Sequence, residues 1–310
     1  MTATLRIGTR RSALALAQTR TIAAALERAG VATTLVEVTT DGDRDRRSPL
    51  SRIGGQGVFV GSLRDALLRG EIDVAVHSLK DLPTQRIDEI TIAAVPTRED
   101  PRDALVARDG LTLATLPPGA RVGTGSPRRL ALLRVHHKSD LELVEIRGNV
   151  DTRIGKVRSG ELDAVVLARA GLTRLGRERE ITETFDPTEF VPAPGQGALA
   201  VECRNADEDV VRVLAGLDDP CTRAAVTAER AVLAALGAGC SAPMGAFADT
   251  VAGVDGDNLS LHAVVAAVDG SATVRLSTSG PREEAEELGR ALAAALLTEG
   301  ANRLIEERVT

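Results

Sequence analysis

Residues 185–203, FDPTEFVPAPGQGALAVEC, decide how the chain is divided into domains. The first part of this stretch is dense in Pro and Gly, which is typical of a crossing between two domains. The apolar run Ala198–Cys203 that follows it predicts a buried strand. We expect this strand to return to a sheet that began before the crossing, so that the first domain is built from two separate stretches of chain.

Before this crossing the chain alternates between strand and helix patterns in two series, separated by the turn-rich segment 96–103. This alternation is typical of open α/β sheets, which bind ligands beyond the carboxyl ends of their strands. Two such sheets joined by two crossings predict a hinged cleft. The expected strands are 5–8, 35–39, 73–77 and 90–95 in the first series, and 104–107, 121–123, 141–146 and 162–167 in the second.

From Asp218 onward the pattern changes to a helix, a Gly-rich loop, three alternating strands within 244–279 and an acidic helix. This order predicts a small α+β domain with an antiparallel sheet. The predicted fold is therefore α/β, with two open-sheet domains and a small α+β C-terminal domain. The expected domains are residues 1–96 with 197–216, residues 101–191, and residues 218–310, and the charged, Gly-rich segment 41–57 is expected to form a lid.

The composition argues against several classes of partner. The chain has 310 residues with four Phe, no Trp and no Tyr, so it has few of the rings on which nucleic-acid-binding proteins stack bases. Its net charge of −6 gives no general attraction for a polyanion. The three Cys have no metal-ligand spacing and suit a reducing compartment, and the stretch 231–248 is too weakly apolar for a membrane span. We expect a cytoplasmic monomer without a metal, a nucleic-acid partner or a membrane partner.

Arginines gather where helices are expected to begin, around residues 10–12, 126–129 and 147–153. A helix N-terminus carries a partial positive charge, so an Arg there is unfavourable unless a bound anion compensates for it. Arg also pairs with carboxylates through two parallel hydrogen bonds. The pattern predicts a ligand with several carboxylates or phosphates. Solvated arginines in an Arg-rich proteome are the alternative, since only three of the 38 basic residues are Lys.

Two further segments can carry chemistry. In DVAVHSLKDLP, residues 73–83, Lys80 and Asp81 follow a buried strand, where Asp81 can act as an acid or base or stabilise a developing cation. A surface ion pair, or a turn before Pro83, is the alternative. In LGAGCSAPMGAF, residues 236–247, Cys240 lies just beyond a helix C-terminus, which disfavours a thiolate nucleophile but allows a covalent tether. An unused cysteine is the alternative there.

Eight segments, spread over nearly the whole chain, resemble in the same order those of the porphobilinogen deaminase family, also called hydroxymethylbilane synthase. They are IGTRRSALALAQ (7–18), GGQGVFV (54–60), DVAVHSLKDLP (73–83), GTGSPRR (123–129), EIRGNVDTRI (145–154), LDAVVLARAGL (162–172), PAPGQGALAVECR (192–204) and GAGCSAPMGA (237–246).

The resemblance implies three domains, the first two like periplasmic binding proteins with the active site between them. It implies a dipyrromethane cofactor held by a thioether to Cys240. It also implies an enzyme of tetrapyrrole (heme) biosynthesis, a transferase that condenses four porphobilinogen molecules head to tail into hydroxymethylbilane and releases ammonia each time. Asp81 matches the catalytic Asp of the family. The positions that match binding residues are Arg10, Ser12, Gln18, Phe59, Lys80, Thr124, Ser126, Arg128, Arg129, Arg147, Arg153 and Gln196.

Two positions depart from the family pattern. Gly125 stands where we expect Ser, and Gln56 stands where many relatives carry Lys. Neither position is Asp81, Cys240 or one of the arginines that match binding residues.

Two other functions fit parts of the sequence. A non-catalytic two-lobed module that binds a carboxylate ligand would explain the arginines, but it gives Cys240 and the third domain no role. A phosphate-binding enzyme would require a metal or a phosphate loop, and no such motif is found in the sequence.

Overall fold

The computed structural model describes residues 4–39, 58–136, 141–239, 242–253 and 256–306. The chain forms two compact units, the first made of residues 1–99 with 198–223 and the second of residues 100–197 with 224–310. The predicted lid, 41–57, and Gln56 within it lie outside the described residues. The division into three domains stays a prediction.

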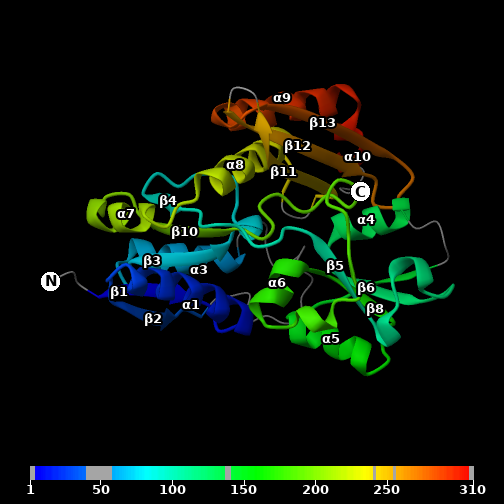
Figure 1. Cartoon of the computed structure of the whole chain (residues 1–310), viewed down its shortest axis with the longest axis horizontal. Coiled ribbons are helices and arrows are strands. Elements are labelled where there is room, and N and C mark those ends of the chain that lie inside the picture. Colours follow the sequence, from blue (N-terminus) through cyan, green and yellow to red (C-terminus); the bar gives the residue numbers. More distant parts are fainter. Residues whose placement is uncertain (1–3, 40–57, 137–140, 240–241, 254–255, 307–310) are drawn as a thin grey trace. The chain divides into compact units, whose positions relative to one another are not determined.

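A five-stranded mixed sheet forms the centre of the described part of the first unit (Figure 1). The strands, in their order across the sheet, are β2 (Thr33–Glu37), β1 (Leu5–Thr9), β3 (Val74–Ser78), β10 (Leu199–Arg204) and β4 (Ile90–Ala94). Strand β1 pairs in parallel with β2 and β3, whereas β10 pairs antiparallel with β3 and β4. The expected return of the chain to its first sheet is therefore confirmed, and the returning strand lies inside the sheet.

Three helices of this unit are α1 (Ala13–Arg28), α3 (Val58–Leu68) and α7 (Glu208–Ala215). The Ser12 side chain caps α1, and Gly30 follows the helix with a φ of +81° that Gly adopts readily. The buried face of α1 presents Ile22 and Leu26 to Ile7 of strand β1. The first turn of α1 is thereby fixed at the carboxyl end of β1.

The second unit contains another five-stranded mixed sheet. Its order is β7 (Glu142–Glu145), β6 (Arg121–Thr124), β8 (Ala164–Ala168), β5 (Asp103–Ala107) and β9 (Glu183–Thr184). Strand β6 is parallel to β7 and β8, whereas β5 is antiparallel to β8 and β9. The helices here are α4 (Pro127–His136), α5 (Val150–Arg158) and α6 (Arg169–Arg174).

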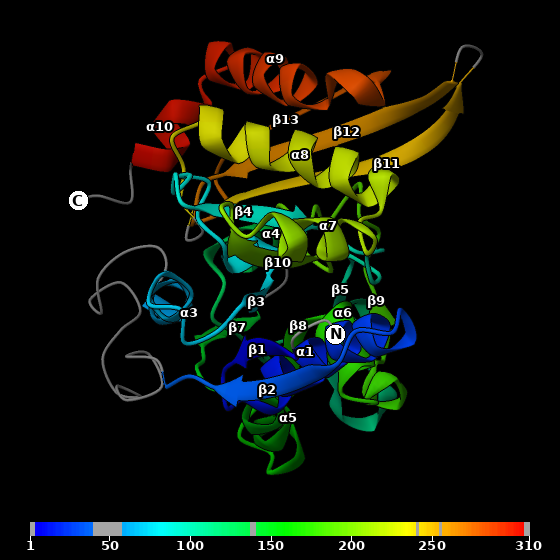
Figure 2. The same cartoon turned by 90° about the vertical axis from the view of Figure 1, so that its left-hand side faces the viewer.

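The C-terminal part forms a three-stranded antiparallel sheet of β11 (Met244–Gly253), β12 (Gly256–Ala266) and β13 (Thr273–Pro281). Helices α8 (Pro220–Ala235), α9 (Ala285–Thr298) and α10 (Ala301–Glu306) pack with it around one apolar core, and Figure 2 shows α9 running along the sheet. Two open mixed sheets and one small antiparallel sheet confirm the predicted fold class among the described residues.

Side chains of both sheets of the second unit share one buried cluster. Phe247 of β11 and Val264 of β12 pack with Phe185, Phe190 and Val191 of the segment after β9. Arg275 of β13 donates hydrogen bonds to the carbonyl groups of Thr188 and Glu189 in the same segment. Because of these contacts, the C-terminal sheet belongs to the same compact unit as the second five-stranded sheet.

Candidate functional site

In the first unit, the predicted residues gather at the carboxyl ends of β1 and β3. The Ser12 Oγ accepts a hydrogen bond from the Ala15 amide at 3.2 Å, which caps the helix that follows Arg10. One and a half turns later the buried Gln18 side chain donates from Nε2 to the Ser78 Oγ at 2.7 Å. This bond ties α1 to the last residue of β3.

Lys80 and Asp81 lie in a single 3₁₀ turn, Leu79–Asp81, directly after β3. The Leu79 amide donates to the Ala198 carbonyl at 3.0 Å, and the Leu82 amide donates back to the Leu79 carbonyl at 3.1 Å. Leu79 and Leu82 are buried whereas the Asp81 side chain is exposed. The turn is therefore held by its two leucines, and the carboxylate of Asp81 is left at the surface of the unit.

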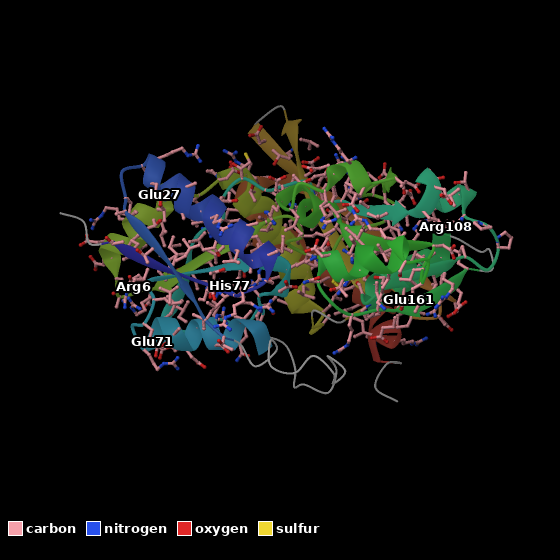
Figure 3. The ribbon with its side chains drawn as sticks, turned by 90° about the horizontal axis from the view of Figure 1, so that it is seen from below. Arg6, Glu27, Glu71, His77, Arg108 and Glu161 are labelled. Atoms are coloured by element: carbon pink, nitrogen blue, oxygen red, sulfur yellow. The ribbon has the colours of Figure 1, made fainter. Side chains whose placement is uncertain are left out.

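A buried ion cluster lies within the same sheet, and the sequence did not indicate it. Glu202 of β10 accepts from Arg64 of α3 at 3.0 Å and 2.7 Å, and its Oε2 lies 3.2 Å from the Nε2 of His77 on β3. Burial alone would raise the pKa of Glu202, but its polar contacts with His77 and Arg64 outweigh this and lower the pKa to about 2. Figure 3 labels His77 inside this unit, and Glu71 at its surface.

In the second unit, the turn between β6 and α4 is built from predicted residues. Thr124 ends β6, and its Oγ1 accepts from the Ser126 amide at 3.2 Å. The Ser126 Oγ in turn accepts from the Arg129 amide at 3.4 Å, and Pro127 takes the first helical position. This capping places Arg128 and Arg129 in the first turn of α4, as the sequence predicted.

Both arginines are buried, at 3% and 5% exposure, and they meet a carboxylate that the sequence analysis did not single out. Asp103, at the start of β5, is fully buried; its Oδ1 accepts from Arg129 Nε at 3.1 Å and from Nη2 at 2.7 Å. Its Oδ2 lies 2.8 Å from Arg128 Nη1. Burial would raise the pKa of Asp103, but the two guanidinium charges hold it far below its usual range.

Gln196 joins the same cluster. Its Nε2 donates to Asp103 Oδ1 at 2.8 Å and to the Pro101 carbonyl at 2.7 Å, while its Oε1 accepts from Arg129 Nη2 at 3.4 Å. The preceding amide, of Gly195, donates to the buried carboxylate of Glu229 on α8 at 2.6 Å. Glu229 also accepts from the Ala248 amide of β11 at 2.9 Å, so it links the loop of Gln196 to the C-terminal sheet.

Arg147 and Arg153 flank the start of α5, where the Asn149 side chain caps the helix by accepting from the Thr152 amide at 2.9 Å. Arg153 donates from Nε to the Gly148 carbonyl at 2.9 Å. Burial and then repulsion from Arg129 lower the pKa of Arg153 to about 10. Since the charge of Arg129 acts on Arg153, these two predicted residues share one electrostatic environment.

The departure at Gly125 has a steric cause. A Cβ at this position would lie 2.5 Å from the Ile146 carbonyl oxygen, much closer than carbon and oxygen atoms approach without a bond. We therefore expect Gly125→Ala to lower the free energy of unfolding by about 1–3 kcal/mol, because the β6–α4 turn or the end of β7 must shift. Thermal unfolding followed by far-UV circular dichroism measures this, with Gly155→Ala, where the Cβ has open space, as the control. Equal stability of Gly125→Ala and the wild type would contradict the steric explanation.

Each unit thus brings several of the predicted residues together. The first holds Arg10, Ser12, Gln18, Lys80 and Asp81 around two strand ends, and the second holds Thr124, Ser126, Arg128, Arg129, Arg147, Arg153 and Gln196 around two helix starts. Cys240 lies outside the described residues, and so does the side chain of Phe59, although its backbone belongs to α3.

The described residues offer neither a metal site nor a membrane-spanning helix. No group of His, Cys, Asp and Glu side chains in this part of the chain could hold a metal ion. None of the helices described is long and apolar enough to cross a membrane.

Comparison with known proteins gives two family models that match most of the chain. Residues 5–212 match "Porphobilinogen deaminase, dipyromethane cofactor binding domain", and residues 223–298 match "Porphobilinogen deaminase, C-terminal domain". Among solved structures, the methionine binding protein MetQ matches 69% of this chain and 89% of its own, with 12% identity and a TM-score of 0.45.

Curated relatives are similar along nearly the whole chain. Porphobilinogen deaminase 1 of Streptomyces coelicolor is 57% identical over 98% of this chain and 98% of its own. The porphobilinogen deaminase of Acidothermus cellulolyticus is 56% identical over 97% of this chain and 91% of its own. That of Mycobacterium tuberculosis is 54% identical over 97% of this chain and 98% of its own. On this similarity, the chain belongs to the porphobilinogen deaminase family, the hydroxymethylbilane synthases of tetrapyrrole biosynthesis, which carry a dipyrromethane cofactor.

Proposed function

We propose that this chain joins four porphobilinogen molecules head to tail into hydroxymethylbilane, with release of ammonia at each step, on a dipyrromethane primer bound through a thioether to Cys240. The observation in the chain that carries the proposal is the buried arginine pair at the start of α4. Arg128 Nε is buried and has no hydrogen-bond partner among the described residues. A buried donor of this kind requires an acceptor, and a pyrrole acetate or propionate provides one.

The other predicted residues would hold further carboxylates. Each pyrrole of substrate and primer bears two acid side chains, so the growing chain is a dense polyanion. An unpaired carboxylate is expensive to bury, and this cost is offset only where cationic donors surround it. We assign this role to Lys80 and to the guanidinium groups of the site, with the hydroxyl groups of Ser12, Thr124 and Ser126 as additional donors. The guanidinium groups are those of Arg10, Arg128, Arg129, Arg147 and Arg153.

Asp81 would act on the charge that develops during the reaction. When ammonia leaves porphobilinogen, positive charge spreads into the pyrrole ring and onto its N–H group. A carboxylate beside that N–H stabilises the charge in the transition state more than in the ground state, which is what accelerates the step. When bound, the dipyrromethane would supply the terminal pyrrole to which the first substrate is joined, and each later substrate would be joined to the ring added before it.

The support for Cys240 as the attachment point is its position in the segment GAGCSAPMGA, which resembles the family's cofactor loop. We propose three additional contacts of the site with the ligand, namely Gln18, Gln196 and Phe59. We also propose that residues 41–57 form the lid. We further propose three domains, with the boundaries given above, and a cytoplasmic monomer that needs neither a metal nor a nucleic-acid or membrane partner.

The intact mass of the purified protein tests this function. We expect the wild type to exceed its sequence mass by two condensed porphobilinogen units and Cys240→Ser to show the sequence mass alone, because the thioether requires the sulfur. Wild-type protein that is purified unmodified is then incubated with porphobilinogen. If its mass still does not rise, the chain is not a deaminase, and a non-catalytic carboxylate-binding module becomes the better explanation.

A further inference from the structure

Asp103 is the only carboxylate among the described residues within ion-pair distance of either arginine at the start of α4. Its Oδ1 accepts hydrogen bonds from Arg129 and Gln196, and its Oδ2 forms an ion pair with Arg128 at 2.8 Å, without hydrogen-bond geometry. It lies at the first residue of β5, with no exposed surface. All three of its partners are residues that the family resemblance assigns to ligand binding, whereas Asp103 itself is not among them.

The cluster needs this carboxylate for electrostatic reasons. Arg128 and Arg129 are adjacent, buried and placed at the positive end of a helix, and the charge of Arg129 also acts on Arg153. Mutual repulsion and desolvation would turn such side chains toward water. Asp103 is the counter-charge that keeps the first two inside the unit, before any anionic ligand is present.

The contacts also fix how each guanidinium is turned. Arg129 donates from Nε and Nη2 to Asp103 and from Nη1 to the Val166 carbonyl at 3.0 Å, so all three of its nitrogens have protein acceptors. Among the described residues, Arg128 is held through Nη1, which donates to the Val191 carbonyl at 2.8 Å and forms the ion pair with Asp103. Its Nε, part of the side-on edge with which Arg grips a carboxylate, keeps no acceptor among the described residues.

We propose that Asp103 is a positioning residue for the reaction: it holds Arg128 by Nη1 so that the Nε edge is presented to a carboxylate of primer or substrate, and it locks Arg129 and Gln196 around that edge. This role rests on the proposed function. Asp103 touches no ligand itself. It acts through the orientation of the guanidinium groups, whose misplacement by about 1 Å is enough to lower a rate roughly 100-fold.

Asp103→Asn removes the counter-charge at nearly constant volume and tests the proposal directly. We expect this variant to be folded by far-UV circular dichroism, but the fraction carrying the two-unit mass increment to fall roughly tenfold or more, because one partner of a buried charge cluster has been neutralised. The matched control is Asp100→Asn. Asp100 pairs with Arg102 and Arg169, none of which is a predicted site residue, so this variant should keep the wild-type increment.

Asp103→Glu is the second variant, because it keeps the charge but moves the carboxylate by one methylene group. We expect a folded protein whose thermal stability is lowered by the extra methylene at a fully buried site, and kcat/KM for porphobilinogen lower by roughly 100-fold at a temperature where the variant stays folded. If Asp103 only neutralised the charge of the arginines, Asp103→Glu would keep the wild-type kcat/KM, because the negative charge is retained.

The outcomes separate the inference from the proposed function. If the wild type takes up no pyrrole units, the proposed function fails. If the wild type is loaded and both Asp103 variants match it in mass increment and kcat/KM, the function stands and the positioning role is wrong. If neither variant folds, Asp103 serves folding alone, and the positioning role is likewise overturned.

Discussion

Replacing Asp81 by Asn is expected to lower kcat for porphobilinogen consumption by about 100-fold to 1000-fold, which is typical for removing one group that stabilises transition-state charge. The substitution keeps the shape of the side chain but removes the negative charge opposite the developing cation. The fold should not change, because the turn that carries Asp81 is held by the buried Leu79 and Leu82 and by backbone hydrogen bonds. The measurements are initial rates, intact mass and circular dichroism on the same preparation.

The combination of results is what identifies the role. Asp81→Asn should retain the covalent mass increment, because the role assigned to it is in turnover and not in holding the primer. Asp88→Asn, a change of another exposed Asp in the same unit, should leave both rate and mass as in the wild type. Turnover of Asp81→Asn within twofold of wild type would remove Asp81 from the mechanism.

Replacing Glu202 by Gln is expected to have the largest effect on stability, a loss of about 3–5 kcal/mol in the free energy of unfolding. The substitution leaves Arg64 buried beside His77 without its counter-charge, in the centre of the first sheet. Because the chain has no Trp and no Tyr, urea unfolding is best followed by far-UV circular dichroism. Glu71→Gln is the control. Glu71 also pairs with an Arg, namely Arg69, but at the exposed surface, so no measurable change is expected there.

The same carboxylate predicts a dependence on pH. The pKa of Glu202 is about 2 in the folded chain, compared with an ordinary value of 4.5. A lowered pKa means that the ionised group stabilises the fold at pH values above 4.5, and that this contribution is lost as the pH falls from 4.5 toward 2. The difference in stability between wild type and Glu202→Gln should therefore shrink over this range. A difference that is constant from pH 6 to pH 3 would show that the charge of Glu202 is not what stabilises the sheet.

Local patterns in the sequence predicted most of the elements because those elements depend on local rules. The cap at Ser12, the proline at position 127 and the cap at Asn149 mark helix starts that the structure has within a residue. The apolar runs of β3, β5 and β8 are strands buried on both faces, which leave an unbroken hydrophobic signal. Helix α7 and the short strand β9 were not predicted, and β9, with only two residues, is too short to show a period.

The candidate site was predicted less completely, for a different physical reason. The arginines at helix starts are visible in the sequence, but their counter-charges are not. Asp103 reads as a turn residue before a strand, and it meets Arg129, 26 positions away, only through the packing of α4 on the sheet. Glu202 reads as an interruption of an apolar strand, and it meets Arg64 across 138 positions. A pairing of this range leaves no periodicity that a single sequence can reveal.

The place of β10 inside the first sheet has a consequence for how the chain is synthesised. Among the described strands, β4 pairs only with β10, and the whole second sheet lies between them in the sequence. During translation β1, β2 and β3 leave the ribosome in order and can pair, but β4 must wait unpaired until every strand of the second sheet has been made. For that interval the growing protein exposes the edges of β3 and β4, which is where association with other nascent chains would begin.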